Sequence, residues 1–561
     1  MAWEFCILNT SKTHELMSQL LGSNRNQLEF FCLESAIAED SIVRIIEVLV
    51  DVMPITDLGF MEKGQSKEGR PAYSAGVLLK LYLYGYFNRV RSSRRLEREC
   101  QTNLEAIWLL KGLKPCFRTI AGFRQDNSEA LGKSFSWFNR FLRGEELFSR
   151  EEVATDGTKI RGQNSRKNNY NEKKVNQHLS YIDNQIRGYL EELDLVDMSE
   201  EEEHQEEKQL ELSAKLDQMT VRRQKYEALS QQVKAAHEKG ETQISTTDPD
   251  VRALPVKLRN IELGYNVIAT AESKNKLITN FEVRNTHDTY ALSKAGIDAR
   301  EVLGLKPGEK LRQLADKGFD TGSELKKCQE NDIETYVATK RRFNPKVDRA
   351  FRKDKFRYDE KTDTYICPAG QAMTTTGTLY QRNKDKLHRA YSVKRYRHLP
   401  RVCQACEYYT RCVSKSSRKR GSPRYVERSQ YDDYIEDNKS RTLLNKETYG
   451  RRQQIIEHPF GTIKRQWGYD YTLLKGLKKV SGEWAIIFWV YNLRRSLTIL
   501  GQKELRRRLR EGLDVFFRRI RADFKLLSRM ISDCGIIAHS DVKQNTMRQS
   551  RVMSLSGVLI S

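Results

Sequence analysis

Three carboxylates in this sequence stand beside small or basic residues, at positions where a strand or helix is expected to end or turn. Asp156 lies in "TDGTK", Asp316 in "ADKGF" and Glu457 in "EHPFGTIK". If they meet in space, their like charges repel and raise their pKa values unless a cation neutralises them. Carboxylate oxygens suit Mg²⁺, and two such ions can activate a hydroxyl group and stabilise the leaving oxygen in phosphoryl transfer. The alternative is that Asp156 and Asp316 are turn residues, and the spacing alone leaves both readings open.

Four of the ten cysteines form a second candidate site. Cys367, Cys403, Cys406 and Cys412 follow the pattern C-x35-C-x2-C-x5-C, and the central pair has the spacing of zinc ligands. His388 and His398 could each replace a thiolate, and the alternative is four free thiols in a basic loop. Four thiolates leave no open position on a metal, so the pattern predicts a structural Zn²⁺ site and not a catalytic one.

The net charge bears on the partner of this protein. The chain has 561 residues and a formal charge of +23, which suggests about two to four domains and a polyanionic partner such as nucleic acid. Basic clusters such as "KSSRKRGSPR" favour nucleic acid over the alternative of a merely soluble basic protein. The start "MAWEFCILNT" has no signal-peptide pattern, and the run "WAIIFWVY" is too short to cross a bilayer. We therefore expect a cytoplasmic protein in a reducing compartment, with no membrane partner.

Residues 1–150 are expected to be mostly helical. "AGVLLKLYLYGYF" has the length and apolar face of a helix, and "SSRRLEREC" follows with serines that can cap the next one. Arg91, Arg94 and Arg95 lie in this region, which suits a helical domain that binds DNA ends. The alternative is a helical bundle with a solvated basic face.

Residues 151–500 alternate between strand and helix signals. A strand is expected around 153–160, and further strands at "GYNVIATAES" and "LITNFEVRNT". Between the first and second of these strands, residues 172–240 carry apolar residues at spacings of three and four, broken by "SEEEEHQEEK". This pattern predicts an antiparallel helical hairpin. The order strand, strand, strand, helix, strand, helix, strand then predicts an α/β fold with a mixed sheet, interrupted after its first strand.

The later part of the chain has three segments. Residues 340–440 are basic, contain the four clustered cysteines and are expected to be rich in loops. Residues 445–500 return to helix. Residues 501–561 are expected to form a basic amphipathic helix and a weakly structured tail.

Four short motifs occur together in one order: "DGTKIRG", "GYNVIATAES", "ADKGFDTG" and "EHPFGTIKR". In that order they resemble the DDE transposases of bacterial insertion sequences. The stretch around "GRPAYSAGVLLKLYLYGYF" resembles the N-terminal helical domain common in that group, and "CPAG" and "CQAC" have counterparts there. The resemblance covers roughly residues 40–500. It implies a ribonuclease-H-like catalytic core over 151–500, with 172–240 and 340–440 as inserts.

The resemblance also implies a function. Asp156, Asp316 and Glu457 would bind two Mg²⁺ or Mn²⁺ ions, cleave double-stranded DNA at the ends of the element and transfer its 3′-hydroxyl into target DNA. Lys464 and Arg465 would contact DNA, and the protein would act as a homodimer on DNA ends near the bacterial nucleoid. Two alternatives remain: a catalytically inactive DNA-binding regulator derived from a transposase, and a hydrolytic nuclease of the same fold.

One branch of these transposases has a Tyr, Arg, Glu, Lys signature around its glutamate. Tyr449, Arg452, Glu457 and Lys464 match its order, and Glu457 and Lys464 would share a helix face. Arg452 lies five residues before Glu457. Five residues rotate a helix by about 500°, so the two side chains are expected to point in different directions. Asp320 is a weaker alternative to Asp316, because Asp316 directly follows apolar strand residues.

Overall fold

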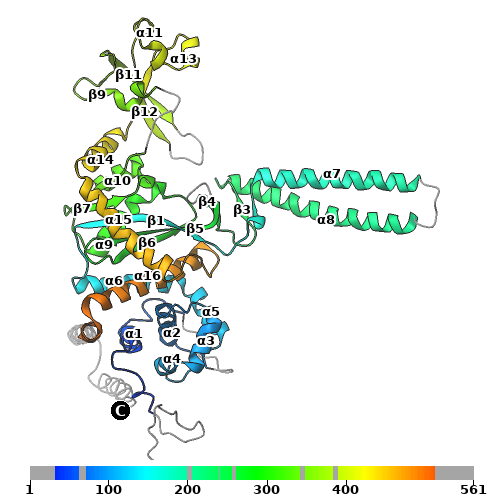
Figure 1. Ribbon diagram of the computed structural model, residues 1–561, viewed down its shortest axis with the longest axis vertical. Helices are drawn as coiled ribbons and strands as arrows, with labels where there is room; N and C mark the ends of the chain where they lie inside the picture. Colours follow the sequence, from blue (N-terminus) through cyan, green and yellow to red (C-terminus); the bar gives the residue numbers. More distant parts are fainter. Residues whose placement is uncertain are drawn as a thin grey trace, which may run out of the picture.

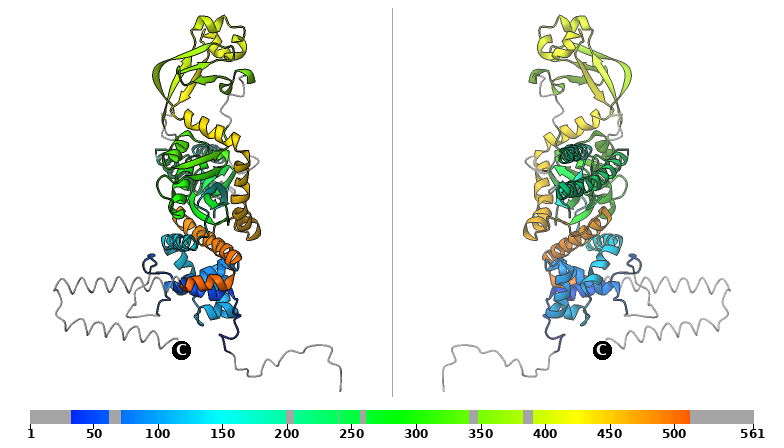
Figure 2. Two further views of the ribbon diagram at one scale, coloured as in Figure 1. Left: turned by 90° about the vertical axis from the view of Figure 1, so that its left-hand side faces the viewer. Right: turned by 90° about the vertical axis from the view of Figure 1, so that its right-hand side faces the viewer.

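The structure is a computed structural model that describes residues 32–61, 71–198, 205–238, 240–255, 261–340, 348–382 and 390–511. Figure 2 shows three parts stacked along the long axis: a small sheet at one end, a larger sheet with its helices in the middle, and the N-terminal helices at the other end. Within the described ranges, no helix is both long and apolar enough to cross a membrane.

The N-terminal part is entirely helical where it is described. Ser41, Ser74 and Asn103 each accept a backbone N–H through the side chain and so begin the helices that follow them. Helix α2 is buried almost all round, and the other helices pack about it. The helices are α1 (Ile42–Asp51), α2 (Ala75–Phe87), α3 (Ser93–Thr102), α4 (Leu104–Leu109), α5 (Phe117–Asp126) and α6 (Ser128–Gly144).

A mixed sheet of six strands forms the middle part, with β1 at its centre. The strand order is β4-β5-β1-β7-β8. β6 also pairs with β5, on the same edge as β4 but further along the strand. β1 runs antiparallel to β5 and parallel to β7, which is parallel to β8. The strands are β1 (Glu152–Arg161), β4 (Arg252–Pro255), β5 (Ile261–Glu272), β6 (Ile278–Arg284), β7 (Leu311–Ala315) and β8 (Ile333–Val337). The predicted order of a helical region followed by a mixed α/β sheet is therefore confirmed.

Helices cover the two faces of this sheet differently. The helix α9 (Leu292–Leu303) covers the face of Thr155, since Gln313 of β7 donates both to the Thr155 hydroxyl and to the Leu292 carbonyl. The helix α15 (Lys446–Phe460) crosses the opposite face, where it contacts β1 and β5 (Figure 1). The helices α10 (Gly322–Glu330) and α14 (Asp432–Leu444) flank β8, and α16 (Leu477–Leu500) lies between the sheet and the N-terminal helices.

Two long helices project sideways from the sheet between β1 and β5 (Figure 1). α7 (Glu172–Asp197) and α8 (Gln205–Glu238) lie side by side, and Val175, Ile182 and Leu229 are buried in the seam between and below them. At their base, β2 (Asn169–Tyr170) pairs with β3 (Ile244–Ser245). The apolar spacing of three and four in this segment is that of two helices facing each other.

Residues 340–440 contain a second sheet, which the sequence analysis missed when it expected a loop-rich segment. Its order is β13-β12-β11-β10-β9, and all neighbours are antiparallel. The strands are β9 (Arg357–Asp359), β10 (Thr364–Ile366), β11 (Ala372–Arg382), β12 (Tyr391–Arg397) and β13 (Tyr425–Ser429). Its core is small and largely aromatic. Burial of these rings stabilises a sheet whose strands carry many charged residues. Short helices α11 (Pro400–Gln404), α12 (Tyr409–Cys412) and α13 (Lys415–Lys419) complete it.

The C-terminal region is described only in part. Residues 502–511 are helical, as expected for the start of an amphipathic segment. The rest of the predicted helix and tail over 501–561 lies outside the described residues.

A buried ion pair joins the N-terminal helices to the sheet. Glu483 of α16 is fully buried, and Arg91, which precedes α3, lies 3.6 Å from it. The Glu483 carboxylate also accepts the backbone N–H groups of Leu473 and Leu474. Arg91 in turn donates to the Tyr471 carbonyl and stacks on Tyr471 at 4.5 Å. Arg91, predicted to contact DNA, is instead a buried structural residue, because its carboxylate partner comes from much later in the chain.

Glu483→Ala should lower the free energy of unfolding by about 3–5 kcal/mol, because it leaves the Arg91 charge buried without its partner. Urea denaturation followed by tryptophan fluorescence measures this. Lys478→Ala is the control, since its ion pair with Glu129 lies on the surface and should contribute little. Equal unfolding midpoints for the two variants would contradict the importance of the buried pair.

Candidate active site

Asp156 and Asp316 lie at equivalent positions of two neighbouring strands. β1 and β7 are parallel, and Thr155 is in register with Ala315, the last residue of β7. Asp156 is therefore the next residue on β1, and Asp316 is the next residue after β7. Asp316 begins the short 3-10 helix η5 (Lys317–Phe319). The structure thus brings together two of the three carboxylates that the sequence singled out.

The electrostatics of Asp156 reflect this placement. Burial raises the pKa of Asp156 to about 6 from its ordinary 3.8. The Gly157 N–H, which donates to the carboxylate at 2.8 Å, and the Arg452 guanidinium lower this pKa, whereas the nearby Asp316 and Asp288 carboxylates raise it. Burial is therefore the main reason that the charged form of Asp156 is disfavoured, and the two neighbouring carboxylates add to it.

Two side chains of α15 face the aspartates. The Arg452 guanidinium lies 3.4 Å from the Asp156 carboxylate, and Tyr449, one turn earlier, is close enough for Asp316 and Asp156 to raise its pKa, although burial is the larger cause. Arg452 and Glu457 do point in different directions, as the spacing predicted. The sequence analysis did not foresee that Arg452 is the residue that faces the aspartates.

Glu457 lies on the exposed side of α15. Within the described ranges, no group of three His, Cys, Asp or Glu residues is arranged to hold a metal ion. The three predicted carboxylates are therefore not gathered around one point in this structure, although two of them are neighbours. The Glu457 side chain makes no hydrogen bond or ion pair among the described residues.

Lys464 lies against β1 rather than on an open surface. Its ammonium donates to the Thr158 hydroxyl at 2.9 Å and to the Lys159 carbonyl at 3.1 Å, and burial lowers its pKa. Thr158 shares a strand face with Asp156, because they are two residues apart on β1. Lys464 sits in a π-helical segment (Gly461–Gln466) that continues α15 beyond Pro459, so the proline neither ends nor begins the helix.

Asp288 contacts β1 on the face opposite to α15, and the sequence analysis did not identify it. It accepts the Lys159 ammonium at 3.1 Å and the Asn266 amide at 2.7 Å. A Cβ atom at Gly157 would lie 2.3 Å from the Asp288 carboxylate, so Gly157 leaves room for this side chain next to β1. The "DG" of the first motif was the available signal, since a glycine often marks a position where another group approaches the backbone closely. Asp320, the weaker alternative to Asp316, is buried and accepts the Lys340 backbone N–H at 2.8 Å.

The remaining predicted DNA-binding residues lie at the surface. Arg94 and Arg95 of α3 are exposed, and Arg94 also stacks over Phe117 at 5.1 Å. Arg465 is exposed at the end of the π-helical segment. These three side chains are open to a partner, in contrast to Arg91.

The four clustered cysteines line one small cavity of about 40 Å³, together with His398. Burial raises the pKa of Cys403, and the neighbouring Cys367 and Cys406 thiols raise it further. Burial also raises the pKa of Cys412, to about 11. The chain therefore brings together residues that are distant in sequence, although among the described residues their sulfurs do not form a metal-holding arrangement. His388 lies outside the described residues.

Two family models match segments of this chain. A family described as "Transposase domain (DUF772)" matches residues 31–126, and one described as "Transposase DDE domain" matches residues 366–497. The resemblance to DDE transposases that the motifs indicated is thereby confirmed. The second match contains Glu457 and all four clustered cysteines.

Comparison with solved structures gives one distant match. A cryo-EM structure of a piggyBac transposase synaptic complex with hairpin DNA aligns with 88% of this chain and 83% of that chain, at 9% identity and a TM-score of 0.27. No curated protein sequence matches the chain.

The raised pKa of Asp156 gives a prediction for stability in metal-free buffer. Because the unfolded chain loses this proton near pH 3.8 and the folded chain near pH 6, Asp156 should destabilise the fold progressively as pH rises between those values. Asp156→Asn replaces the ionisable carboxyl group with a neutral amide, so its stability relative to the parent should rise by about 2 kcal/mol between pH 4 and pH 6. Thermal unfolding of both proteins at each pH measures this, and a difference that stays constant with pH would refute it.

Proposed function

We propose that this protein is a DDE transposase with a ribonuclease-H-like core, which cleaves double-stranded DNA at the ends of an insertion sequence and joins the 3′-hydroxyl to target DNA. The observation that carries the proposal is the placement of Asp156 and Asp316 side by side on adjacent parallel strands, Asp156 within β1 and Asp316 directly after β7. The strand order, with three antiparallel strands on one side of the pair and a further parallel strand on the other, supports the ribonuclease-H-like assignment. Under this proposal 1–150 binds DNA ends, 151–500 is the catalytic domain, and 172–240 and 340–440 are inserts within it.

The residues present fit divalent metal. Two carboxylates share a region in which the pKa of Asp156 is raised, and a divalent cation would neutralise both. Glu457 is the third ligand in this proposal, because its side chain is exposed and makes no other polar contact among the described residues. Two Mg²⁺ or Mn²⁺ ions would supply activation of the nucleophile and stabilisation of the leaving oxygen.

The other side chains have defined parts in this proposal. Arg452 holds the Asp156 carboxylate from one side, and the Gly157 N–H holds it from the other, so its position is fixed before DNA arrives. Lys464 fastens the helix that carries Glu457 to β1. Arg94, Arg95 and Arg465 are exposed cations that would bind phosphates of the transposon ends and target. We further propose that the active form is a homodimer on DNA ends in the bacterial cytoplasm, associated with the nucleoid.

Asp156→Ala, Asp316→Ala and Glu457→Ala should each reduce cleavage and joining below about 1% of the parent rate, because each ligand acts at the chemical step. Binding to DNA ends should remain. The assay incubates full-length protein with its flanking DNA ends and Mg²⁺ and resolves cut and joined products. Glu447→Ala, an exposed glutamate on the same helix, is the matched control and should keep full activity.

The same assay separates the two alternatives. Cut products without joined products from the parent protein would favour a hydrolytic nuclease. Binding without either product would favour an inactive DNA-binding regulator. Parent-level cutting by Glu457→Ala would remove Glu457 from the proposed ligand set.

The cysteine cavity gives a prediction about metal content. Protein purified without chelator should contain about one zinc per chain, and Cys403→Ser with Cys406→Ser should lose it. Cys100→Ser, a buried cysteine in the N-terminal helices, is the control and should keep the zinc. Elemental analysis measures the ratio, and a parent protein without zinc would leave the four thiols free.

A further inference from the structure

A large cavity lies between the middle part of the molecule and the five-stranded sheet. Its volume is about 900 Å³, in the upper part of the range of about 300–1,000 Å³ for small-molecule sites. One wall comes from Asp320, Thr321 and the start of α10, only four residues beyond Asp316. The other wall comes from β12, β13 and the turn into α14. The cavity therefore adjoins the candidate active site.

The five-stranded sheet presents one particular face to this cavity. Val393 is in register with Ser429, and Arg397 with Tyr425, so these residues share a face. Val393, Tyr425 and Ser429 line the cavity. The alternate residue Tyr396 points into the core of that sheet, and Val426 borders both this core and the cavity. One face thus holds the sheet together, and the other is available to a ligand.

The lining suits a chain of phosphates that carries flat bases. Its aromatic residues are Tyr290, Tyr391, Tyr425 and Tyr431. Its charged residues are Lys327, Lys340, Arg352, Lys353 and Arg424, against Asp320, Glu427 and Asp432, which is five positive and three negative charges. Glu427 pairs with Arg382 and Arg395, and Lys327 pairs with Glu324, all three partners lying outside the lining. Lys353 pairs with Asp432 within the lining. The other charged residues of the lining are Lys340, Arg352 and Arg424 against Asp320, three positive charges to one negative. The positive excess favours an anion, and tyrosine rings provide surfaces on which bases stack.

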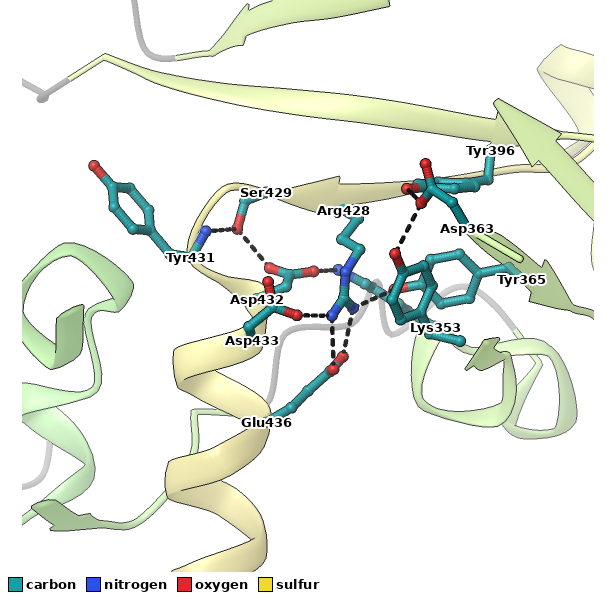
Figure 3. Close-up of polar contacts among 11 residues, drawn as sticks. Lys353, Asp363, Tyr365, Tyr396, Arg428, Ser429, Tyr431, Asp432, Asp433 and Glu436 are labelled. Carbon is teal, nitrogen blue, oxygen red and sulfur yellow. Dashed lines mark hydrogen bonds and ion pairs between the residues drawn. The ribbon is translucent and has the colours of Figure 1, made fainter. Parts of the chain in front are cut away.

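The walls of the cavity are held in place by polar contacts (Figure 3). Arg428 of β13 donates to Glu436 at 3.0 Å and to the Tyr365 hydroxyl at 3.1 Å, and it also pairs with Asp433. The Ser429 hydroxyl donates to Asp432 at 2.5 Å. On the other side, a Cβ atom at Gly322 would lie 2.4 Å from the Tyr431 Cβ, so α10 packs directly on the turn into α14. A site whose walls are fixed in advance loses less entropy on binding.

We propose that this cavity binds a short single-stranded stretch of DNA next to the cleaved bond, with phosphates beside the lysines and bases stacked on the tyrosines. The inference rests on the proposed function, since it extends the DNA path from Asp316 into the cavity. In a duplex the bases are paired and stacked on one another, so their faces are not open to the tyrosines. Single-stranded DNA exposes the bases that the tyrosines would contact.

The test compares two cavity variants of the full chain with two matched controls. Tyr425→Ala removes an exposed cavity ring, and its control is Tyr380→Ala, which also stacks on Arg395 but does not line the cavity. Lys327→Gln removes a cavity cation, and its control is Lys326→Gln on the same helix. Both lysines make an ion pair of 3.7 Å, Lys327 with the buried Glu324 and Lys326 with the exposed Glu330. The probes are a fluorescent oligothymidylate and a blunt duplex, measured by anisotropy without added Mg²⁺ or Mn²⁺.

Tyr425→Ala should weaken oligothymidylate binding about tenfold, through the loss of stacking. Lys327→Gln should weaken it and lower the slope of log affinity against log salt by about 0.7. Both controls should bind the oligothymidylate like the parent, and all four variants should bind the duplex like the parent.

The outcomes separate this inference from the proposed function. Cavity variants that bind the oligothymidylate like their controls would overturn the inference, as would cavity variants that change association between chains instead of DNA binding. A parent protein that binds the duplex but not the oligothymidylate would also overturn it and leave the proposed function standing. A parent protein that binds neither probe would contradict the proposed function itself.

Discussion

The fully buried Glu483 carboxylate connects three segments that are distant in sequence. It pairs with Arg91 from the N-terminal helices and accepts the backbone N–H groups of Leu473 and Leu474, while its own helix packs against the sheet. The loop that it holds pairs with the end of β1, because the Arg161 N–H donates to the Asp470 carbonyl. A buried charge must keep its partners or the fold loses several kcal/mol, so this one residue fixes the N-terminal helices relative to the strand that carries Asp156.

From that fixed strand, the alternation of side chains distributes the chemistry between two faces. Asp156 and Thr158 point to the face of α15, where Arg452 and Lys464 meet them. Gly157, which lies between them, is on the other face, where Asp288 occupies the space that a side chain at this position would need. The two faces therefore have different electrostatic roles: one carries the candidate site, and the other neutralises Lys159 and packs α9.

The sequence predicted features that depend on local patterns. The positions of Asp156 and Asp316 followed from strand signals, and the spacing of apolar residues in 172–240 matched the helices found there. Features that depend on rotation or on distant partners were not predictable. A shift of one residue turns a helical side chain by about 100°, so the orientation of Arg452 and Glu457 on α15 is set by packing and not by motif order. Arg91 looked like a DNA contact because nothing near it in the sequence reveals Glu483. The five-stranded sheet was missed because its few core residues are scattered among lysines and arginines.

The paired helices between β1 and β5 also affect how the chain folds. β1 is central, yet its antiparallel neighbour β5 is made only after the whole of α7 and α8. An unstructured connection of that length would make the pairing of the two strands slow, because loop closure costs entropy before any contact forms. Here α7 and α8 form from local contacts, and β2 pairs with β3 at their base. Once α7 and α8 have paired, the end of α8 lies next to the start of α7. β5 then pairs with β1 as if only a short connection separated the two strands.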